Sequence, residues 1–119
     1  NMAIKRELLE VEVTFNETEI YAKSAKDAVE HRLYNIDGVL EWDTHMITSV
    51  DNDDDTTTEK FLLCVVYNTY DLSGTSLEDV IDTELYTEDG VIGYATQPLK
   101  ESTLDAAIAL EEISYGSSN

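Results

Sequence analysis

The residues from Lys5 to Phe15 alternate between apolar and polar side chains. A period of two is typical of a strand that buries one face and exposes the other. A turn at Asn16 and Glu17 then predicts a second strand from Thr18 to Ala22, paired with the first as a hairpin. The apolar positions of the first strand are Leu9, Val11, Val13 and Phe15.

The pattern changes to a helical period after this hairpin. Ser24 is a good helix N-cap residue, and Asp27 three positions later is a weak capping-box acid. Residues spaced at i, i+3, i+4, i+7, i+8 and i+11 then form one face of a helix. Asp37 and Gly38 end this helix. The members of this face are Ala25, Ala28, Val29, Arg32, Leu33 and Ile36.

The middle of the chain predicts two more strands. One runs from about Glu41 to Val50, with imperfect alternation, and the sequence DNDDD with three threonines follows it as an exposed loop. The run FLLCVVY, from Phe61 to Tyr67, is uninterrupted, as in a central strand covered on both faces. We therefore expect Cys64, with six apolar neighbours, to be a small buried hydrophobic residue and not a reactive thiol.

The last third of the chain predicts a helix, a short edge strand and another helix. Ser76 caps the first of these helices, whose apolar stripe is Leu77, Val80, Ile81 and Leu85. Asp89 and Gly90 turn the chain into a strand from Val91 to Ala95, and the final helix runs from about Ser102 to Ile113. The fold predicted is α+β: a mainly antiparallel sheet of four to five strands with two to three helices packed on it.

Length and composition limit the classes of protein that fit. A chain of 119 residues predicts a single small domain, residues 1–119. Asp and Glu total 26 and Lys and Arg only 7, so the formal net charge is −19. Such a charge disfavours direct binding to nucleic acid or to anionic membranes. One cysteine excludes an internal disulfide framework.

The ends of the chain give weaker indications. Because Asn1 precedes Met2, we expect Asn1 to be a cloning remnant and Met2 the native start. The residues that follow have no apolar core of a signal peptide, so the expected location is the cytoplasm, that of a host cell if a phage encodes the protein. Residues 114–119 are small and polar, as in a frayed tail.

One segment resembles a known family. The stretch LEVEVTFNETEIYAKSAKDAVEHRL is similar to the β-β-α unit of DpnD/PcfM-type small phage and plasmid proteins, in which V-x-A-x-S-x-x-E-A joins the second strand to the helix. The matching positions are Ile20, Ala22, Ser24, Asp27 and Ala28. The resemblance covers about residues 8–37 and contains no catalytic residue; it implies a phage or mobile-element source.

No catalytic motif is present, and we do not expect an enzyme or a cofactor. An EF-hand loop starting at Asp51 fails because Thr56 replaces the required glycine and Leu62 the bidentate glutamate. We therefore interpret the acidic residues from Asp51 to Asp55 as a solvated loop, with weak cation binding as the alternative. His31 and His45 have no nucleophile or ligand pattern around them. Tyr86 flanks an acidic turn, where we expect packing at the edge of the core over a role in recognition.

The acidity is the main functional signal. No basic residue lies between Lys60 and Lys100, and like charges on one helix face cost stability. We therefore expect a non-enzymatic interaction protein whose acidic face occupies the basic groove of a nucleic-acid-binding enzyme, as a DNA-mimic inhibitor. The alternative is a structural or accessory domain, such as a phage particle or assembly component, whose acidity only keeps it soluble. The predicted partner-binding residues are Glu78, Asp79, Asp82, Glu84, Glu88 and Asp89, with Asp51, Asp53, Asp54 and Asp55 as a second patch.

Overall fold

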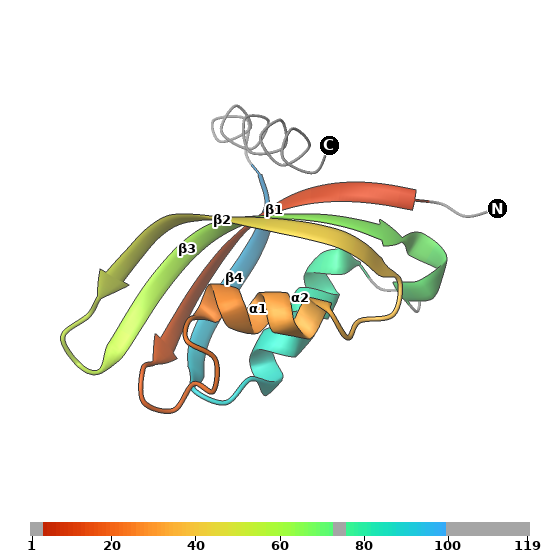
Figure 1. Cartoon of the computed structure of the whole chain (residues 1–119). Coiled ribbons are helices and arrows are strands. Elements are labelled where there is room, and N and C mark those ends of the chain that lie inside the picture. The colour runs from red at the N-terminus through yellow and green to blue at the C-terminus, as the bar shows by residue number, and fades with distance from the viewer. Residues whose placement is uncertain (1–3, 73–75, 100–119) are drawn as a thin grey trace.

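A computed structural model describes residues 4–72 and 76–99 of the chain. Its four strands form one antiparallel sheet in the order β2-β3-β1-β4, with both helices on the same side of it (Figure 1). This arrangement confirms the predicted α+β class. The elements are β1 (Ile4–Asn16), α1 (Ala25–Leu33), β2 (Val39–Asp51), β3 (Thr56–Asn68), the 3-10 turn η1 (Thr69–Leu72), α2 (Leu77–Thr87) and β4 (Val91–Pro98).

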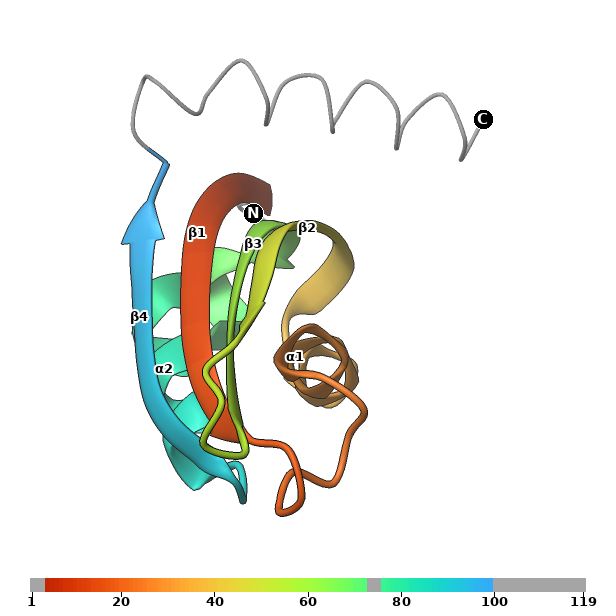
Figure 2. The ribbon, with the colours of Figure 1, turned by 90° about the vertical axis from the view of Figure 1, so that its left-hand side faces the viewer.

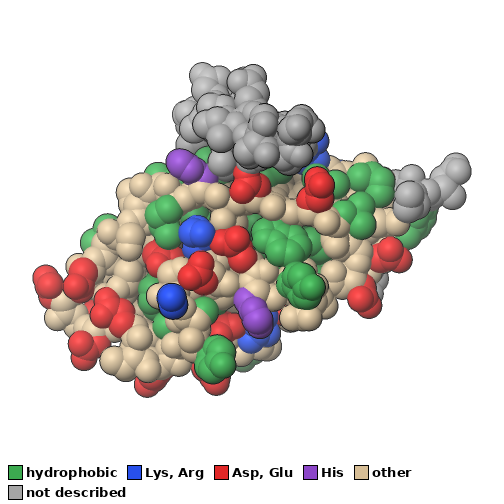
Figure 3. Space-filling view, in the orientation of Figure 1, with side chains coloured by type: hydrophobic (Ala, Val, Ile, Leu, Met, Phe, Trp, Pro, Cys, Tyr) green, Lys and Arg blue, Asp and Glu red, His purple; other side chains and the backbone are tan. Residues whose placement is uncertain are grey.

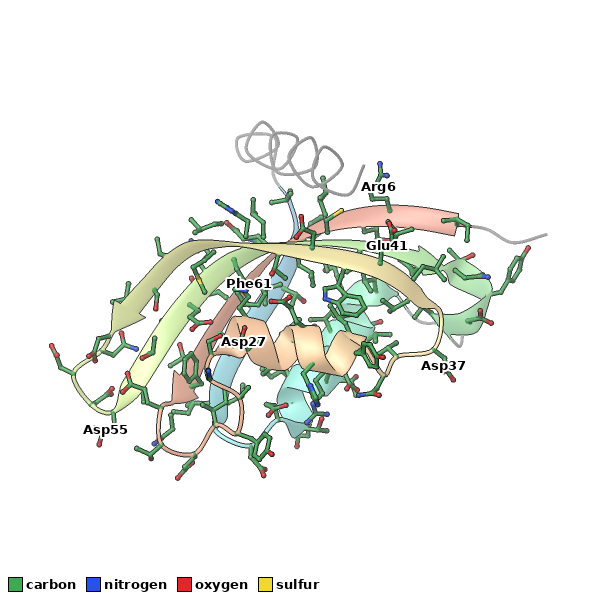
Figure 4. All side chains as sticks on the ribbon, viewed as in Figure 1. Arg6, Asp27, Asp37, Glu41, Asp55 and Phe61 are labelled. Atoms are coloured by element: carbon green, nitrogen blue, oxygen red, sulfur yellow. The ribbon has the colours of Figure 1, made fainter. Side chains whose placement is uncertain are left out.

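Strand β3 lies in the interior of the sheet, paired with β2 on one side and β1 on the other. Its odd-numbered residues face the helices, and Phe61 and Leu63 lie opposite Val11 and Leu9 of β1 in the core. Figure 4 shows Phe61 between the sheet and the helices. The even-numbered residues point to the other face, where Leu62 is 1% exposed and the Cys64 residue 8%. The predictions of a central strand and of a buried cysteine are confirmed.

The two helices cover different halves of the sheet. Helix α1 packs mainly against β2, and α2 packs mainly against β4 (Figure 2). Both predicted caps are present, because Ser24 accepts the N–H of Asp27 and Ser76 accepts that of Asp79, each at 3.1 Å. The amphipathic stripes then close one core with the sheet, as their periodicity predicted.

The buried carboxylate of Glu59 completes the start of α1. This side chain belongs to β3, is 4% exposed, and accepts the backbone N–H of Lys26 at 3.0 Å. The first N–H groups of a helix have no partner inside the helix, so an acceptor from the sheet satisfies one of them. Burial raises the pKa of the Glu59 carboxyl, and the N–H groups of Lys26 and Ala25 oppose this rise.

The predicted second strand from Thr18 to Ala22 is wrong, because these residues form turns and bends. Asn16 directs the chain there: its side-chain oxygen accepts the N–H of Thr18 at 2.9 Å, and its carbonyl accepts that of Ile20 at 3.1 Å. Strand β1 also has no edge left for a hairpin partner, since β3 and β4 occupy both sides of it. The connection from β1 to α1 is therefore a loop.

Other element bounds differ from the sequence prediction. The three threonines after the acidic loop begin β3, because Thr14 and Thr58 face each other across the ladder and share a hydrogen bond of 2.8 Å. Strand β4 continues to Pro98, and α1 ends at Leu33. The predicted helix from Ser102 to Ile113 and the predicted tail 114–119 lie outside the described residues. Within the described residues, no helix is both long and apolar enough to cross a membrane.

The raised pKa of Glu59 predicts a specific pH dependence of stability. A carboxyl with a raised folded-state pKa stabilises the fold most below its unfolded-state pKa, and this contribution is lost as the pH rises through the folded-state value. Glu59→Gln removes the titration but keeps a hydrogen-bond acceptor. We expect the free energy of unfolding of the native protein, relative to that of Glu59→Gln, to fall between pH 4 and pH 7 in urea titrations. Parallel pH profiles of the two proteins would contradict this role.

Candidate acidic interaction site

The α2 helix carries four of the ten predicted partner-binding residues, Glu78, Asp79, Asp82 and Glu84. It buries Leu77, Ile81 and Leu85, so its remaining positions form a polar face. Glu78 and Asp79 lie in its first turn, where the helix dipole favours negative charge. Its last turn has no basic residue. The structure thus places these acids on one helix, as predicted, but they have different surroundings.

Arg32 of α1 engages two of the predicted acids. Its Nε donates to the carboxylate of Glu88 at 2.8 Å, and its Nη1 donates to Glu84 at 3.3 Å and to the hydroxyl of Thr87 at 3.0 Å. The Glu88 side chain is only 12% exposed. These contacts join α1 to the end of α2. The main role of Glu88 is therefore to hold the two helices together.

The remaining acids of this group differ in accessibility. Asp82 is partly buried and accepts the hydroxyl of Thr96 in β4 at 2.6 Å, so it fixes α2 against the sheet. Asp79 and Asp89 are exposed, and Glu78 is partly exposed. Of the six acids predicted on and after α2, Asp79 is thus both exposed and close to the pocket described next.

An open pocket of about 380 Å³ lies between the end of α1, the turn η1 and α2. Carboxylates from separate segments surround it, and its lining contains no Lys or Arg. Apolar side chains make up most of the rest of the wall. We call this the acidic pocket; its lining residues are Ile36, Asp37, Asp71, Leu72, Asp79, Val80, Thr83 and Glu84.

Gly38 brings two of these carboxylates together. Its φ of +93° lies in the left-handed region, and a Cβ built on it would stand 2.8 Å from the Cβ of Asp71. The carbonyl of Gly38 accepts the N–H of Asn68 at 2.8 Å, which fixes the turn after α1 against the end of β3. Only a residue without a side chain permits this approach, and Asp37 and Asp71 both line the pocket on either side of it.

Sequence reasoning missed Asp37 and Asp71 as site residues. The sequence pattern assigns Asp37 only to the end of a helix, and it does not single out Asp71 within the stretch from Lys60 to Lys100 that lacks basic residues. The two lie 34 positions apart in the sequence. The turn signal at Gly38 was visible, but its tertiary neighbour at η1 was not.

The second predicted patch lies at the tip of the β2–β3 hairpin, and its acids are exposed. Asp51 accepts the N–H of Asp53 at 2.9 Å, and Asp54 accepts that of Thr56 at 3.2 Å, so these carboxylates also shape the loop itself. Asp53 and Asp55 have left-handed φ values of 64° and 66°. Figure 4 shows Asp55 and Asp37 at opposite ends of the molecule, so the hairpin tip lies far from the Asp37 side of the acidic pocket.

Exposed tyrosines lie near the acids on two elements. Tyr86 is 78% exposed on α2, which makes the prediction that it packs at the edge of the core wrong. Tyr70, next to Asp71 in η1, is 68% exposed. Tyrosine is enriched in protein interfaces because its ring has large area and its hydroxyl bonds to water or to a partner.

The described residues contain no cluster suited to a metal ion. No group of three or more His, Cys, Asp or Glu there has the geometry to hold a metal ion. His31 and His45 are both exposed. In Figure 3, acidic side chains gather at the hairpin tip and are otherwise spread among polar and apolar groups on the visible face.

No protein-family model matches this chain, and a search of curated proteins finds no match.

The role of Gly38 can be tested by stability measurements. We expect Gly38→Ala to lower the free energy of unfolding by roughly 1–3 kcal/mol, because a Cβ would face both backbone strain and the side chain of Asp71. Gly93→Ala is the matched control, since a Cβ there meets nothing within 4 Å. Its stability should stay the same or rise slightly. Equal midpoints for the two variants in urea would show that Gly38 is not needed for this turn.

Proposed function

We propose that this protein is a non-enzymatic acidic interaction protein whose acidic pocket and adjoining α2 face bind a basic protein surface. The observation that carries the proposal is the convergence of Asp37, Asp71 and Asp79 on one open pocket whose wall has no basic side chain; Glu84, the fourth carboxylate of the wall, is paired with Arg32. Crowded carboxylates repel one another, and this repulsion is relieved when a cation approaches. A partner's lysine or arginine supplies that charge on a side chain that can enter the pocket.

The pocket suits a long basic side chain in shape as well as in charge. Ile36, Leu72 and Val80 offer apolar contacts to the methylene groups of a lysine or arginine. The surrounding carboxylates can bind the charged end of this side chain. An arginine guanidinium binds a carboxylate by two parallel hydrogen bonds. Exposed Tyr70 and Tyr86 provide further contact area on the flanking elements.

The partner that best fits this chemistry is an enzyme that binds nucleic acid. Such an enzyme presents basic side chains in a groove that normally holds phosphates. A formal net charge of −19 steers the protein toward such a groove and favours fast, salt-sensitive association. In this proposal the bound protein excludes the substrate by competition, so it acts as a DNA-mimic inhibitor. The phage or mobile-element source implied by the DpnD/PcfM resemblance is part of the same proposal.

A second candidate function follows from the distribution of charge in Figure 3. Acids spread over a surface raise solubility without forming a band of phosphate-like spacing. That pattern favours the accessory role, in which the domain is a structural component, for example of a phage particle. The two proposals make different predictions for binding. The inhibitor role requires the pocket carboxylates to contribute more to binding than the carboxylates of the hairpin tip, whereas the accessory role does not.

Neutralising variants test this difference. Asp71→Asn with Asp79→Asn removes two charges from the acidic pocket, whereas Asp53→Asn with Asp55→Asn removes two from the hairpin tip. Asn tolerates the left-handed conformation of the hairpin positions, so both double variants should fold. The partner would be captured from host lysate at low salt and released by raising the salt concentration.

We expect the pocket variant to bind this partner on the order of ten-fold more weakly, mainly through a slower association rate. The hairpin variant should change little, because a loop tip has to lose conformational entropy to hold a fixed charge pattern. Added nucleic acid should displace the protein from its partner. Equal, small losses in both variants would indicate diffuse charge, and a lack of displacement by nucleic acid would favour the accessory role.

A further inference from the structure

Strand β2 forms one edge of the sheet. Among the residues that the structure describes, it pairs with β3 on one side and with no strand on the other. Edge strands present unpaired N–H and C=O groups, and many proteins protect such edges with lysine or proline. Strand β2 is 13 residues long and contains no Lys, Arg or Pro. Its outer edge can therefore pair with another extended chain.

The regular part of this edge is residues 41–46, which we call the β2 edge. Register shifts interrupt the β2–β3 ladder before and after these residues, which pair one to one with β3. Alternate residues of an antiparallel ladder direct their N–H and C=O groups away from the partner strand. Thr44 belongs to this outward set, because its N–H donates to the side-chain oxygen of Asp43 at 3.1 Å. Trp42 and Met46, two positions to either side, present their backbone groups at the same edge.

The two faces of the β2 edge differ in chemistry. Glu41 and Asp43 lie on the face away from the helices, where Figure 4 shows Glu41. Trp42 packs against the core on the helix side, and its ring meets the ring of Tyr34 edge-on, with centroids 6.3 Å apart. Tyr34 is 79% exposed. Carboxylates thus follow one face of the edge and aromatic rings the other.

Charge selects the occupant of this edge. The charged residues of β2 are Glu41, Asp43 and Asp51, all acidic. A second copy of the chain would bring an equally acidic strand and another formal net charge of −19, so repulsion opposes self-pairing. A basic segment of another protein would instead place lysine or arginine across from the carboxylates, where opposite charges stabilise a strand pair. Because side chains alternate along a strand, its apolar residues would then face the aromatic rings.

We propose that the β2 edge binds an extended basic segment of a partner protein as a fifth strand of the sheet. A carbonyl of the incoming strand takes the N–H of Thr44 from Asp43, and the released carboxylate pairs with a lysine or arginine of the segment. Trp42 and Tyr34 contact the apolar side chain between the basic ones. None of these residues lines the acidic pocket, so binding here does not depend on the function proposed above.

A synthetic peptide tests this surface on the full-length protein. The probe is a blocked peptide as long as the β2 edge that alternates lysine with valine, and the single tryptophan, Trp42, reports binding by its fluorescence. Methylation of every backbone amide of the peptide keeps its charge but removes its donors. We expect the methylated peptide to bind on the order of ten-fold more weakly. The unmethylated peptide should slow hydrogen exchange at the amide of Thr44.

Variants of the edge separate strand pairing from charge. Thr44→Pro removes the outward N–H and keeps the bonds to β3, so it should weaken binding of the unmethylated peptide on the order of ten-fold. Thr44→Val is its matched control, because it also loses the hydroxyl bond to Glu30 but keeps the N–H, and it should bind as the native chain does.

Charge variants complete the test. Glu41→Gln with Asp43→Asn should weaken binding roughly five-fold. Asp53→Asn with Asp55→Asn removes the same charge at the hairpin tip and should leave binding unchanged, as should Asp71→Asn with Asp79→Asn at the acidic pocket.

Equal binding of the methylated and unmethylated peptides would overturn the proposal, since charge attraction alone would then explain the affinity. A native dimer that Thr44→Pro dissociates would also overturn it, because a second copy would occupy the edge. If Thr44→Pro does not fold, hydrogen exchange of the native chain decides: an unchanged rate at Thr44 with peptide bound contradicts strand addition. Weaker binding in the pocket variant than in the edge variant would place the peptide at the acidic pocket and equally contradict it.

Discussion

The structure depends on the pairing of β3 with β1. The two strands run antiparallel in continuous register from Ile4 opposite Asn68 to Asn16 opposite Thr56. Because β3 is apolar on both faces, it forms the floor of the helix-side core and also the centre of the opposite face. Every other element is placed relative to this pair: β2 and β4 extend it on either side, and α1 and α2 cover it. A break in this ladder would remove the surface on which both helices pack.

The chain has many acidic residues and few basic ones. The ion pairs of the basic residues show which acids are neutralised within the fold. Arg32 bridges α1 to Glu84 and Glu88, and Lys26 pairs with Glu30 at 2.8 Å beside the buried Glu59. Arg32 thus acts where two helices meet, whereas Lys26 pairs with a carboxylate of its own helix. The cost of burying Glu59 is offset mainly by helix N–H groups, with a smaller contribution from the charge of Lys26. Acidic surface and stable core are thus compatible because the scarce positive charge is used internally.

Local patterns predicted the elements but not their tertiary partners. Alternation gave β1, the apolar run gave β3, and Ser24 and Ser76 gave the starts of both helices, since each signal lies within a few residues. The stretch from Thr18 to Ala22 was misassigned, because its fate depended on β4 taking the free edge of β1 from 75 residues further along the chain. The acidic pocket was missed for the same reason: it forms where the turn at Gly38 approaches Asp71, a contact that no period in the sequence records.

Charge alone does not define an interaction site, and the contacts of each carboxylate separate two roles. Glu88 and Asp82 are occupied by Arg32 and Thr96, so their charge or hydrogen-bonding capacity is already used within the fold. Asp37, Asp71 and Asp79 are exposed at the pocket, and no ion pair among the described residues engages them. Three defined elements carry them: a turn fixed by Gly38, the 3-10 turn after the central strand, and a capped helix. Preorganised negative charge of this kind loses little entropy on meeting a cation. At the hairpin tip, by contrast, Asp51 and Asp54 already bond to backbone N–H groups of their own loop. The α1–η1–α2 end is therefore the part of the acidic surface with the best geometry for recognition.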